Sequence, residues 1–342
     1  MFKLTLNPMR SRPVYMLIAA VLFIVVLSAC GTSGAEKERQ AAEGKVRIIT
    51  SFFPLADFAR NIGGERVYVS NLVPSGVEPH DWSPKSRDME NIAEGQLFLY
   101  NGAGFEGWVD DFLSTMPKDS KLITVEASKG ISLISAEEEE HADEHAEEGN
   151  THSDSAGNVN HNSEHEHDLS TDPHTWSSPA SALIMGENIK NALVKADPAH
   201  QGEYEENWAS YKEKLTSLHE QFKTKLAATV KKDIVVSHHA FGYLCRDYGL
   251  RQVSIMGLSP DAEPRGQDLL EIAKFVKEHK VKYIFFEELV SDQLARTLAS
   301  EADADTLVLN PVEGLTEEQE QSGEDYISIM EVNLQNLLKA LQ

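Results

Sequence analysis

Short apolar runs alternate with amphipathic stretches along most of the chain. The first run, residues 46–50, is apolar apart from Arg47 and Thr50 and predicts a strand. Residues 54–62 have helical spacing that ends at Gly63 and Gly64. Alternating signals of this kind favour a parallel sheet covered by helices. Further strands are predicted at 67–73, 96–100 and 121–125, with helices at 84–93 and 105–113.

The same order of elements returns after residue 232. At an offset of 186 residues, Ile48-Ile49-Thr50-Ser51 aligns with Ile234-Val235-Val236-Ser237, and Arg60 aligns with Arg246. This repetition predicts two related (β/α) lobes with parallel sheets, and a ligand between them. The second lobe has strands predicted at 252–255, 281–286 and 306–309, and helices at 265–279, 291–302 and from about residue 324.

One long amphipathic helix is predicted at 198–228, with a length of about 45 Å at ~1.5 Å per residue. It should join the lobes as a single rigid strut. Its apolar face has a spacing of three and four residues: Tyr204, Trp208, Tyr211, Leu215, Leu218, Phe222 and Leu226. The predicted organisation is a signal peptide at 1–29, a tether at 30–44, an N-terminal lobe at 45–197, the linker helix at 198–229 and a C-terminal lobe at 230–342.

The first thirty residues have the pattern of a signal peptide. Basic residues precede an apolar run at 14–26 that is short for a membrane span. The segment ends Leu27-Ser28-Ala29-Cys30, which resembles the lipobox of bacterial lipoproteins and implies cleavage before Cys30 and lipid on its thiol. A plain secretory peptide cut nearby is the alternative. Residues 31–44 are small, polar and charged, as in a solvated tether.

Acidic residues outnumber basic ones by 55 to 31, and the net charge is −24. This balance argues against a nucleic-acid partner and favours a cationic ligand. Residues 137–168 hold twelve of the acids, no Lys or Arg, and six histidines. We expect this segment to be a disordered loop that captures metal transiently, with a plain solubilising charge run as the alternative. The histidines are His141, His145, His152, His161, His165 and His167.

Four residues in loops after apolar, strand-like runs form a candidate metal site: His80, His174, His238 and Glu313. Because 64 residues separate the second from the third and 75 separate the third from the fourth, only folded lobes could bring them together. Zn²⁺ suits three imidazoles and one carboxylate in a closed tetrahedron, whereas a catalytic zinc keeps one position open. A closed set favours carrying the metal over using it.

Some neighbours remain alternatives to these ligands. His239 could replace His238, although His238 directly follows its predicted strand. Glu287 or Glu288, at the end of another predicted strand, could replace Glu313. Three aromatic residues near the candidates could form dry walls around a metal or simply pack in the core: Trp82, Trp176 and Phe241.

The surrounding motifs resemble the zinc-binding lipoproteins of bacterial ABC importers, which are relatives of manganese-binding ones. The resemblance extends over about 46–341 and includes the acidic histidine-rich loop. It implies two lobes joined by a rigid helix, metal in the cleft, and ligands at the same four positions. Pro79 is a departure, because some zinc binders have an acid there. The motifs are Glu78-Pro79-His80-Asp81-Trp82, Asp172-Pro173-His174-Thr175-Trp176-Ser177-Ser178-Pro179, His238-His239-Ala240-Phe241-Gly242-Tyr243 and Leu309-Asn310-Pro311-Val312-Glu313-Gly314.

The resemblance implies a monomeric, lipid-anchored receptor outside the cell membrane that delivers Zn²⁺ to an ABC permease and its ATPase. The chain itself has no Gly-x-x-x-x-Gly-Lys-Ser/Thr phosphate loop, and we expect no enzymatic activity. Three imidazoles favour zinc over manganese, which prefers oxygen ligands. The alternatives are a manganese-binding homologue, a surface adhesin of the same fold, and a zinc-dependent hydrolase, which would lack a His-Glu-x-x-His helix here.

Overall fold

The computed structural model describes residues 40–135, 171–260 and 264–342. Lys45–Gln342 forms one compact unit, distinct from Met1–Gly44. The predicted signal peptide, the predicted lipidation site Cys30 and the six histidines of 137–168 lie outside the described residues. Among the residues that are described, no helix is both long and apolar enough to cross a membrane.

Two four-stranded sheets, each entirely parallel, form the centres of two lobes. The first has the order β2-β1-β3-β4 and the second the order β6-β5-β7-β8. The two orders are equivalent, which confirms the predicted α/β fold with two similar lobes. The strands are β1 Val46–Thr50, β2 Val67–Asn71, β3 Leu97–Tyr100, β4 Ile123–Glu126, β5 Asp233–Val236, β6 Arg251–Ser254, β7 Tyr283–Phe286 and β8 Asp305–Val308.

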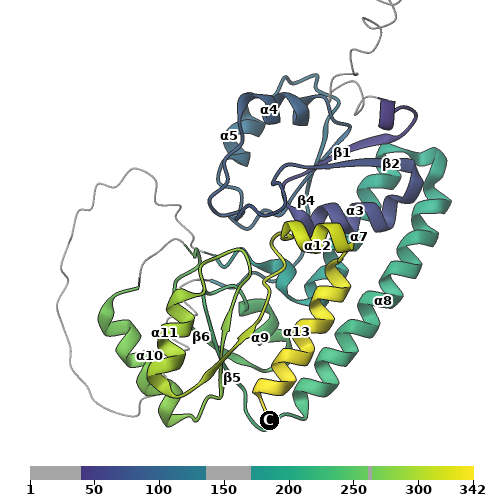
Figure 1. Cartoon of the computed structure of the whole chain (residues 1–342). Coiled ribbons are helices and arrows are strands. Elements are labelled where there is room, and N and C mark those ends of the chain that lie inside the picture. Colours follow the sequence, from purple (N-terminus) through teal and green to yellow (C-terminus); the bar gives the residue numbers. More distant parts are fainter. Residues whose placement is uncertain (1–39, 136–170, 261–263) are drawn as a thin grey trace, which may run out of the picture. The chain divides into compact units, whose positions relative to one another are not determined.

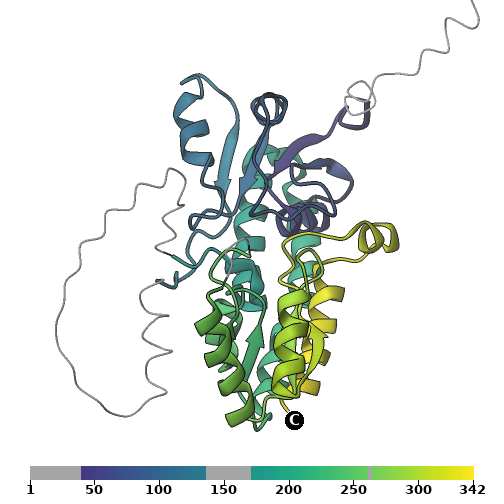
Figure 2. The ribbon, with the colours of Figure 1, turned by 60° about the vertical axis from the view of Figure 1, so that its left-hand side comes forward.

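Helices flank both sheets (Figures 1 and 2). Most fall within a few residues of their predicted bounds, while α9 and α12 were not predicted. The first lobe has α3 Phe53–Gly63, α4 Ser86–Ala93 and α5 Val109–Thr115, and the second has α9 Gly242–Tyr248, α10 Gly266–Glu278, α11 Gln293–Ala302, α12 Glu317–Ser322 and α13 Tyr326–Ala340.

The predicted strut is present as α8, Gln201–Ala227, after a short 3-10 turn at Pro198–His200. All seven residues of its predicted apolar face are buried. The helix contacts α3 in the first lobe, and α9 and α13 in the second. Figure 1 shows it running past both lobes. A single element therefore packs on both halves of the molecule.

A second helix of the connection, α7 at Pro179–Ala196, was missed in the sequence. Ser178 caps it by accepting a hydrogen bond from the Ala180 amide, and Pro179 occupies its first turn, so its start had a recognisable signal. It contacts α3, α8, α9 and the first sheet, and burial on several sides weakens the apolar stripe that predicts a helix. The connection is thus a packed helix pair.

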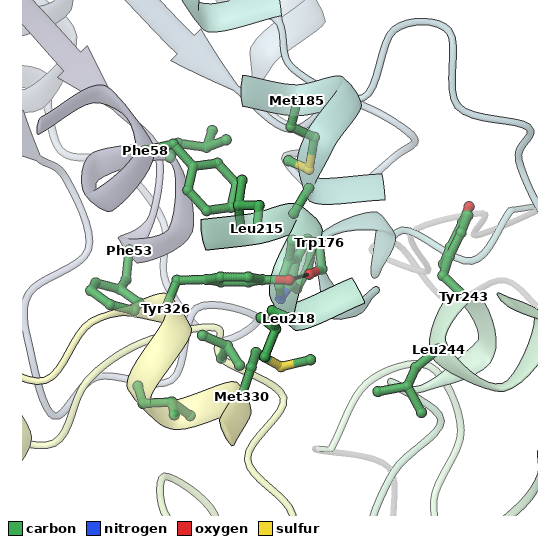
Figure 3. Packing of buried hydrophobic residues seen from close by; sticks show 14 of the residues in the cluster. Phe53, Phe58, Trp176, Met185, Leu215, Leu218, Tyr243, Leu244, Tyr326 and Met330 are labelled. Carbon is green, nitrogen blue, oxygen red and sulfur yellow. Dashed lines mark hydrogen bonds between the residues drawn. The ribbon is translucent and has the colours of Figure 1, made fainter. Parts of the chain in front are cut away.

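One hydrophobic core runs through both lobes and the helices between them (Figure 3). Phe58 of α3 packs edge-on against Tyr326 of α13, with ring centroids 5.0 Å apart. The Tyr326 hydroxyl donates a hydrogen bond of 2.8 Å to the Trp176 carbonyl. Leu215 and Leu218 of α8 lie in the same core. Rotating one lobe against the other would break this packing.

A buried carboxyl lies at the junction of α3, α8 and α13. Asp57 of α3 accepts a hydrogen bond of 3.0 Å from the Tyr211 hydroxyl of α8. Burial raises the pKa of Asp57 to about 6, and Asp325 before α13 also raises it, while the Tyr211 hydrogen bond and Arg60 lower it. The junction therefore contains an acid that titrates near neutral pH.

The contact between α7 and α8 predicts a steric defect for Gly186→Ala. A Cβ at Gly186 would lie 2.4 Å from Trp208 of α8, and the Trp208 indole is held by a 2.6 Å hydrogen bond to Glu187. We expect the variant to lose about 1–3 kcal/mol of unfolding free energy, measured by urea denaturation. Gly202→Ala is the control, because no atom lies within 4 Å of a Cβ there. Equal stability of the two variants would contradict the close packing.

The Asp57 carboxyl predicts a pH dependence of stability. Its folded pKa of about 6 exceeds the unfolded value of ~3.9, so the folded state binds the extra proton between these values. Stability should fall as pH rises through this window, by on the order of 2 kcal/mol relative to Asp57→Asn. Denaturation at pH 4 and pH 7 measures the difference. Parallel pH profiles of the two proteins would refute the assignment, and Tyr211→Phe should move the window to higher pH.

Candidate metal centre

Three of the four candidate ligands follow strands, as predicted. His80 lies in a turn after β2, His238 is two residues beyond β5, and Glu313 is five residues beyond β8. His174 differs, because it does not follow a strand. It follows an isolated bridge between Ser135 and Thr171 and directly precedes a 3-10 turn at Thr175–Ser177. The loop ends of both lobes thus converge on one place.

The four side chains form one compact group of donor atoms, all within 4.8 Å of one another. Nε2 of His80 is 3.2 Å from Nε2 of His174. Oε1 of Glu313 is 3.6 Å from Nε2 of His80 and 3.4 Å from Nε2 of both His174 and His238. Ligands at ~2.0–2.1 Å from zinc in a regular tetrahedron are about 3.3–3.4 Å apart. These four separations, 3.2 to 3.6 Å, are close to that spacing.

Burying these polar side chains without a cation costs solvation free energy. His174, His238 and Glu313 are buried, and the side chain of His80 is 8 % exposed. In the described residues, Nε2 of His238 and both carboxylate oxygens of Glu313 are buried without a hydrogen-bond partner. Unpartnered buried polar atoms lose several kcal/mol of solvation. A divalent cation would satisfy them, so the residues present fit a metal.

Two carboxylates orient the imidazoles from behind. Oδ1 of Asp172 is 2.7 Å from Nδ1 of His174 and also accepts from its backbone amide. Oε1 of Glu287 is 2.8 Å from Nδ1 of His238. With Nδ1 engaged, Nε2 of each ring points toward the shared group. Pairs of this kind set the tautomer and increase the basicity of the ligand.

Neither carboxylate was predicted in this role. Asp172 had a local signal, since it precedes His174 by two residues. Glu287 was considered as a substitute for Glu313, but the structure places it against His238 instead. Glu288 accepts hydrogen bonds from Asn310 and from Gln319. Both alternatives to Glu313 are therefore occupied elsewhere.

His239 lies outside the group as well. Its Nδ1 is 3.2 Å from Oγ of Ser254, and its backbone amide donates to the Gly257 carbonyl. The two consecutive histidines have different partners, and only His238 faces the other candidate ligands.

The protonation states of the group are set by burial and mutual charge. Burial lowers the pKa of His174, so its ring is neutral near pH 7. Burial also acts to lower the pKa of His238, but Glu287 and Glu313 outweigh it and hold the pKa well above its usual value. For Glu313, burial is outweighed by His80 and His238, which keep the pKa well below its usual range. The metal-free group contains an imidazolium beside a carboxylate.

Glu78 supplies an additional carboxyl next to Pro79, the position where some zinc binders have an acid. Its Oε1 accepts a 3.1 Å hydrogen bond from the backbone amide of His80. Burial, and then the charge of Glu313, raise the pKa of Glu78 to about 9. Glu78 also lines a small cavity together with Glu287 and Glu313. A protonated Glu78 adds no negative charge to the site near pH 7.

Aromatic rings cover the group on the side of the first lobe. The centroid of Trp176 is 5.3 Å from that of His174, and the centroid of Phe105, which was not predicted here, is 5.2 Å from that of His80. Trp82 lines a cavity of about 100 Å³ beside His80. Phe241 belongs to the main core. The His80 side is the least covered approach to the group.

A closed group of three imidazoles and one carboxylate between two α/β lobes is the arrangement of a metal-carrying binding protein. The chain belongs to the family described as "Zinc-uptake complex component A periplasmic", which it matches over residues 48–340. This membership confirms the resemblance found in the sequence, and the family is one of solute-binding receptors.

Two curated relatives illustrate the match. The chain is 40% identical over 324 residues to the High-affinity zinc uptake system protein ZnuA of Bacillus subtilis (strain 168), covering 95% of this chain and 96% of that protein. It is 39% identical over 322 residues to the Zinc-binding lipoprotein AdcA of Streptococcus pneumoniae (strain ATCC BAA-255 / R6), covering 94% of this chain. The chain spans only 60% of the length of AdcA.

Solved structures agree with the fold. The Zn(II)-bound ZnuA-like domain of Streptococcus pneumoniae AdcA has a TM-score of 0.71 and 36% identity, covering 87% of this chain and 99% of that chain. The laminin binding protein Lmb of Streptococcus agalactiae, described as bifunctional with adhesin and metal transporting activity, has a TM-score of 0.72 and 28% identity. The match covers 100% of the Lmb chain and 87% of this chain.

Proposed function

We propose that this chain is an extracytoplasmic receptor that binds one Zn²⁺ with high affinity and delivers it to an ABC permease. The observation that carries the proposal is the group of His80, His174, His238 and Glu313, with donor atoms within 4.8 Å of one another. Zinc is the cargo of this protein. The family membership and the Zn(II)-bound structure of a relative support the same conclusion.

The donor set favours zinc over manganese. Three imidazole nitrogens and one carboxylate suit a tetrahedral Zn²⁺, whereas Mn²⁺ prefers oxygen ligands. Glu78 does not add a competing anionic oxygen near neutral pH, because burial and Glu313 raise its pKa to about 9. Manganese should therefore bind weakly.

Zinc binding should release a proton. His238 shares its Nδ1 with Glu287 and faces Glu313 through Nε2, and these acids keep its pKa well above the usual value. Nε2 must lose its proton to coordinate a metal. Affinity should therefore rise with pH until His238 is deprotonated in the metal-free protein.

The location and partners follow from the N-terminal sequence and the relatives. Cleavage before Cys30 and lipidation of its thiol would anchor the chain outside the membrane, with 31–44 as a tether. A relative is named a zinc-binding lipoprotein and another a zinc uptake system protein, which supports an anchored importer component. The partners would be a membrane permease and its ATPase, with the receptor acting as a monomer.

An adhesin role is the second candidate, because Lmb is described as both adhesin and metal transporter. Binding of laminin by the lipid-free protein with its metal ligands substituted would support that role. A zinc hydrolase is disfavoured, since the four donors close the coordination shell that a catalytic zinc leaves open.

The proposed site predicts that His174→Ala abolishes tight zinc binding. We expect the Kd to rise more than ~100-fold, because losing an outer partner of a ligand already costs about 10–100-fold. The zinc-induced increase in Tm should shrink in parallel. Competition with a chromogenic chelator measures the Kd. The matched control is His279→Ala, whose ring stacks on Phe275 at the end of α10. If both variants bind zinc like the wild type, the ligand set is wrong.

The segment 137–168 predicts a separate, weak binding capacity. Its six histidines and twelve acids offer ligands with few apolar residues to order them. Deleting it should remove weak zinc equivalents from a calorimetric titration, leave one tight equivalent, and slow growth only under chelation. Loss of the tight equivalent would place a primary ligand inside the segment and contradict the four-residue site.

A further inference from the structure

Glu313 is presented by a segment with an unfavourable backbone. Val312, directly before it, has φ +62°, in the left-handed region. A β-branched residue in this region is an outlier that persists only when its surroundings hold it. Val312 is fully buried. The position of the Glu313 carboxylate therefore depends on the contacts that hold this turn.

Side chains bind the backbone of this turn on every residue from Asn310 to Val312. Trp176 donates its indole N–H to the Pro311 carbonyl over 2.8 Å. The Val312 amide donates to Oδ1 of Asn310 over 2.7 Å. The Asn310 side chain is itself oriented, because its Nδ2 donates to Glu288. No strand ladder supports this turn among the described residues, and the side chains replace it.

Asn333 of α13 also belongs to this network. Its Oδ1 accepts from the Asn310 amide over 2.9 Å, and its Nδ2 donates to the Asn310 carbonyl over 2.7 Å. One buried side chain thus satisfies both backbone groups of Asn310, as a neighbouring strand would. The residue holds the start of the turn that ends at Glu313.

We propose that Asn333 is a positioning residue for the Glu313 ligand, acting through the Asn310 backbone and the left-handed turn at Val312. The inference rests on the proposed zinc-binding function. Asn333 does not touch the metal group. It restricts the Glu313 carboxylate to the position facing Nε2 of His174 and His238, so that the fourth ligand is in place before zinc arrives.

Loss of this restraint should affect metal binding more than folding. Without Asn333 the turn can relax to a backbone with negative φ at Val312, which moves Glu313 away from the imidazoles. Outer groups that orient metal ligands typically contribute about 10–100-fold in affinity. We expect zinc affinity to fall by ~10-fold or more, mainly through faster dissociation of the ion.

The same helix offers a matched control. Asn336, three residues after Asn333, donates a 2.9 Å hydrogen bond to the Val308 carbonyl of β8, before the turn begins. Asn333→Leu and Asn336→Leu each replace a buried or half-buried amide by an apolar side chain of similar size. Asn333→Ala is a second variant, because it removes both hydrogen bonds to the Asn310 backbone without placing a larger apolar side chain beside it.

The experiment uses Zn²⁺ and Co²⁺ as probes of the wild type, the three variants, Glu313→Ala and the double variant Asn333→Leu/Glu313→Ala. Zinc Kd and dissociation rate are measured by chelator competition. The visible d–d bands of Co²⁺ report the coordination geometry. Urea denaturation of each metal-free protein shows which variants are folded.

If the inference holds, Asn333→Leu weakens zinc binding ~10-fold or more, Asn336→Leu stays within about twofold of the wild type, and the Co²⁺ bands shift toward those of Glu313→Ala. In the Glu313→Ala background, Asn333→Leu should change the Kd less than about twofold, because its effect passes through Glu313. If Asn333→Leu does not fold, Asn333→Ala makes the same comparison.

Equal effects of the Asn333 and Asn336 variants, or additive effects of Asn333→Leu and Glu313→Ala, would overturn the inference while leaving the zinc site intact. A wild type without tight zinc binding, or Glu313→Ala with unchanged affinity, would instead contradict the proposed function or its ligand set. The two failures are therefore distinguishable.

Discussion

The metal group depends on the continuous apolar core that the two lobes share. Its donor atoms come from loops of different lobes, yet they have to lie about 3.3 Å apart to surround one ion. A rotation of one lobe against the other would move these donor atoms apart. The packing of Phe58 on Tyr326, and the burial of α8 against both lobes, oppose that rotation. Packing in the core, away from the metal group, thus fixes the distances between the donor atoms.

The next level of control is electrostatic. Asp172 and Glu287 hold two imidazoles from behind, and Asn333 and Trp176 hold the turn before the carboxylate. Three of the four candidate ligands, His174, His238 and Glu313, therefore have a restraint of their own. Preorganisation of this kind lowers the conformational entropy that metal binding has to offset.

Much of this architecture could be predicted from the sequence. The strands and α8 were found because apolar runs and a helical stripe are local signals. The four candidate ligands were chosen because each lies in a distinctive motif, and the structure brings their donor atoms within 4.8 Å of one another. The helix α7 was missed, since burial on several sides blurs its periodicity, although Ser178 and Pro179 mark its start. The contacts of Glu287 and Asn333 could not be predicted, because each residue is far in sequence from its partner. The separations are 49 residues for Glu287 and His238, and 23 residues for Asn333 and Asn310.

The shared core also limits how a partner could distinguish the metal-loaded protein from the metal-free protein. If the two lobes cannot separate, the outline of Lys45–Gln342 is nearly the same with and without cargo. A membrane partner that distinguishes full from empty molecules must then read a small patch of surface rather than a change of shape. His80 is the ligand with an exposed side-chain edge, beside Trp82 and Phe105. The partner would then recognise whether the exposed part of the His80 side chain is held in one position.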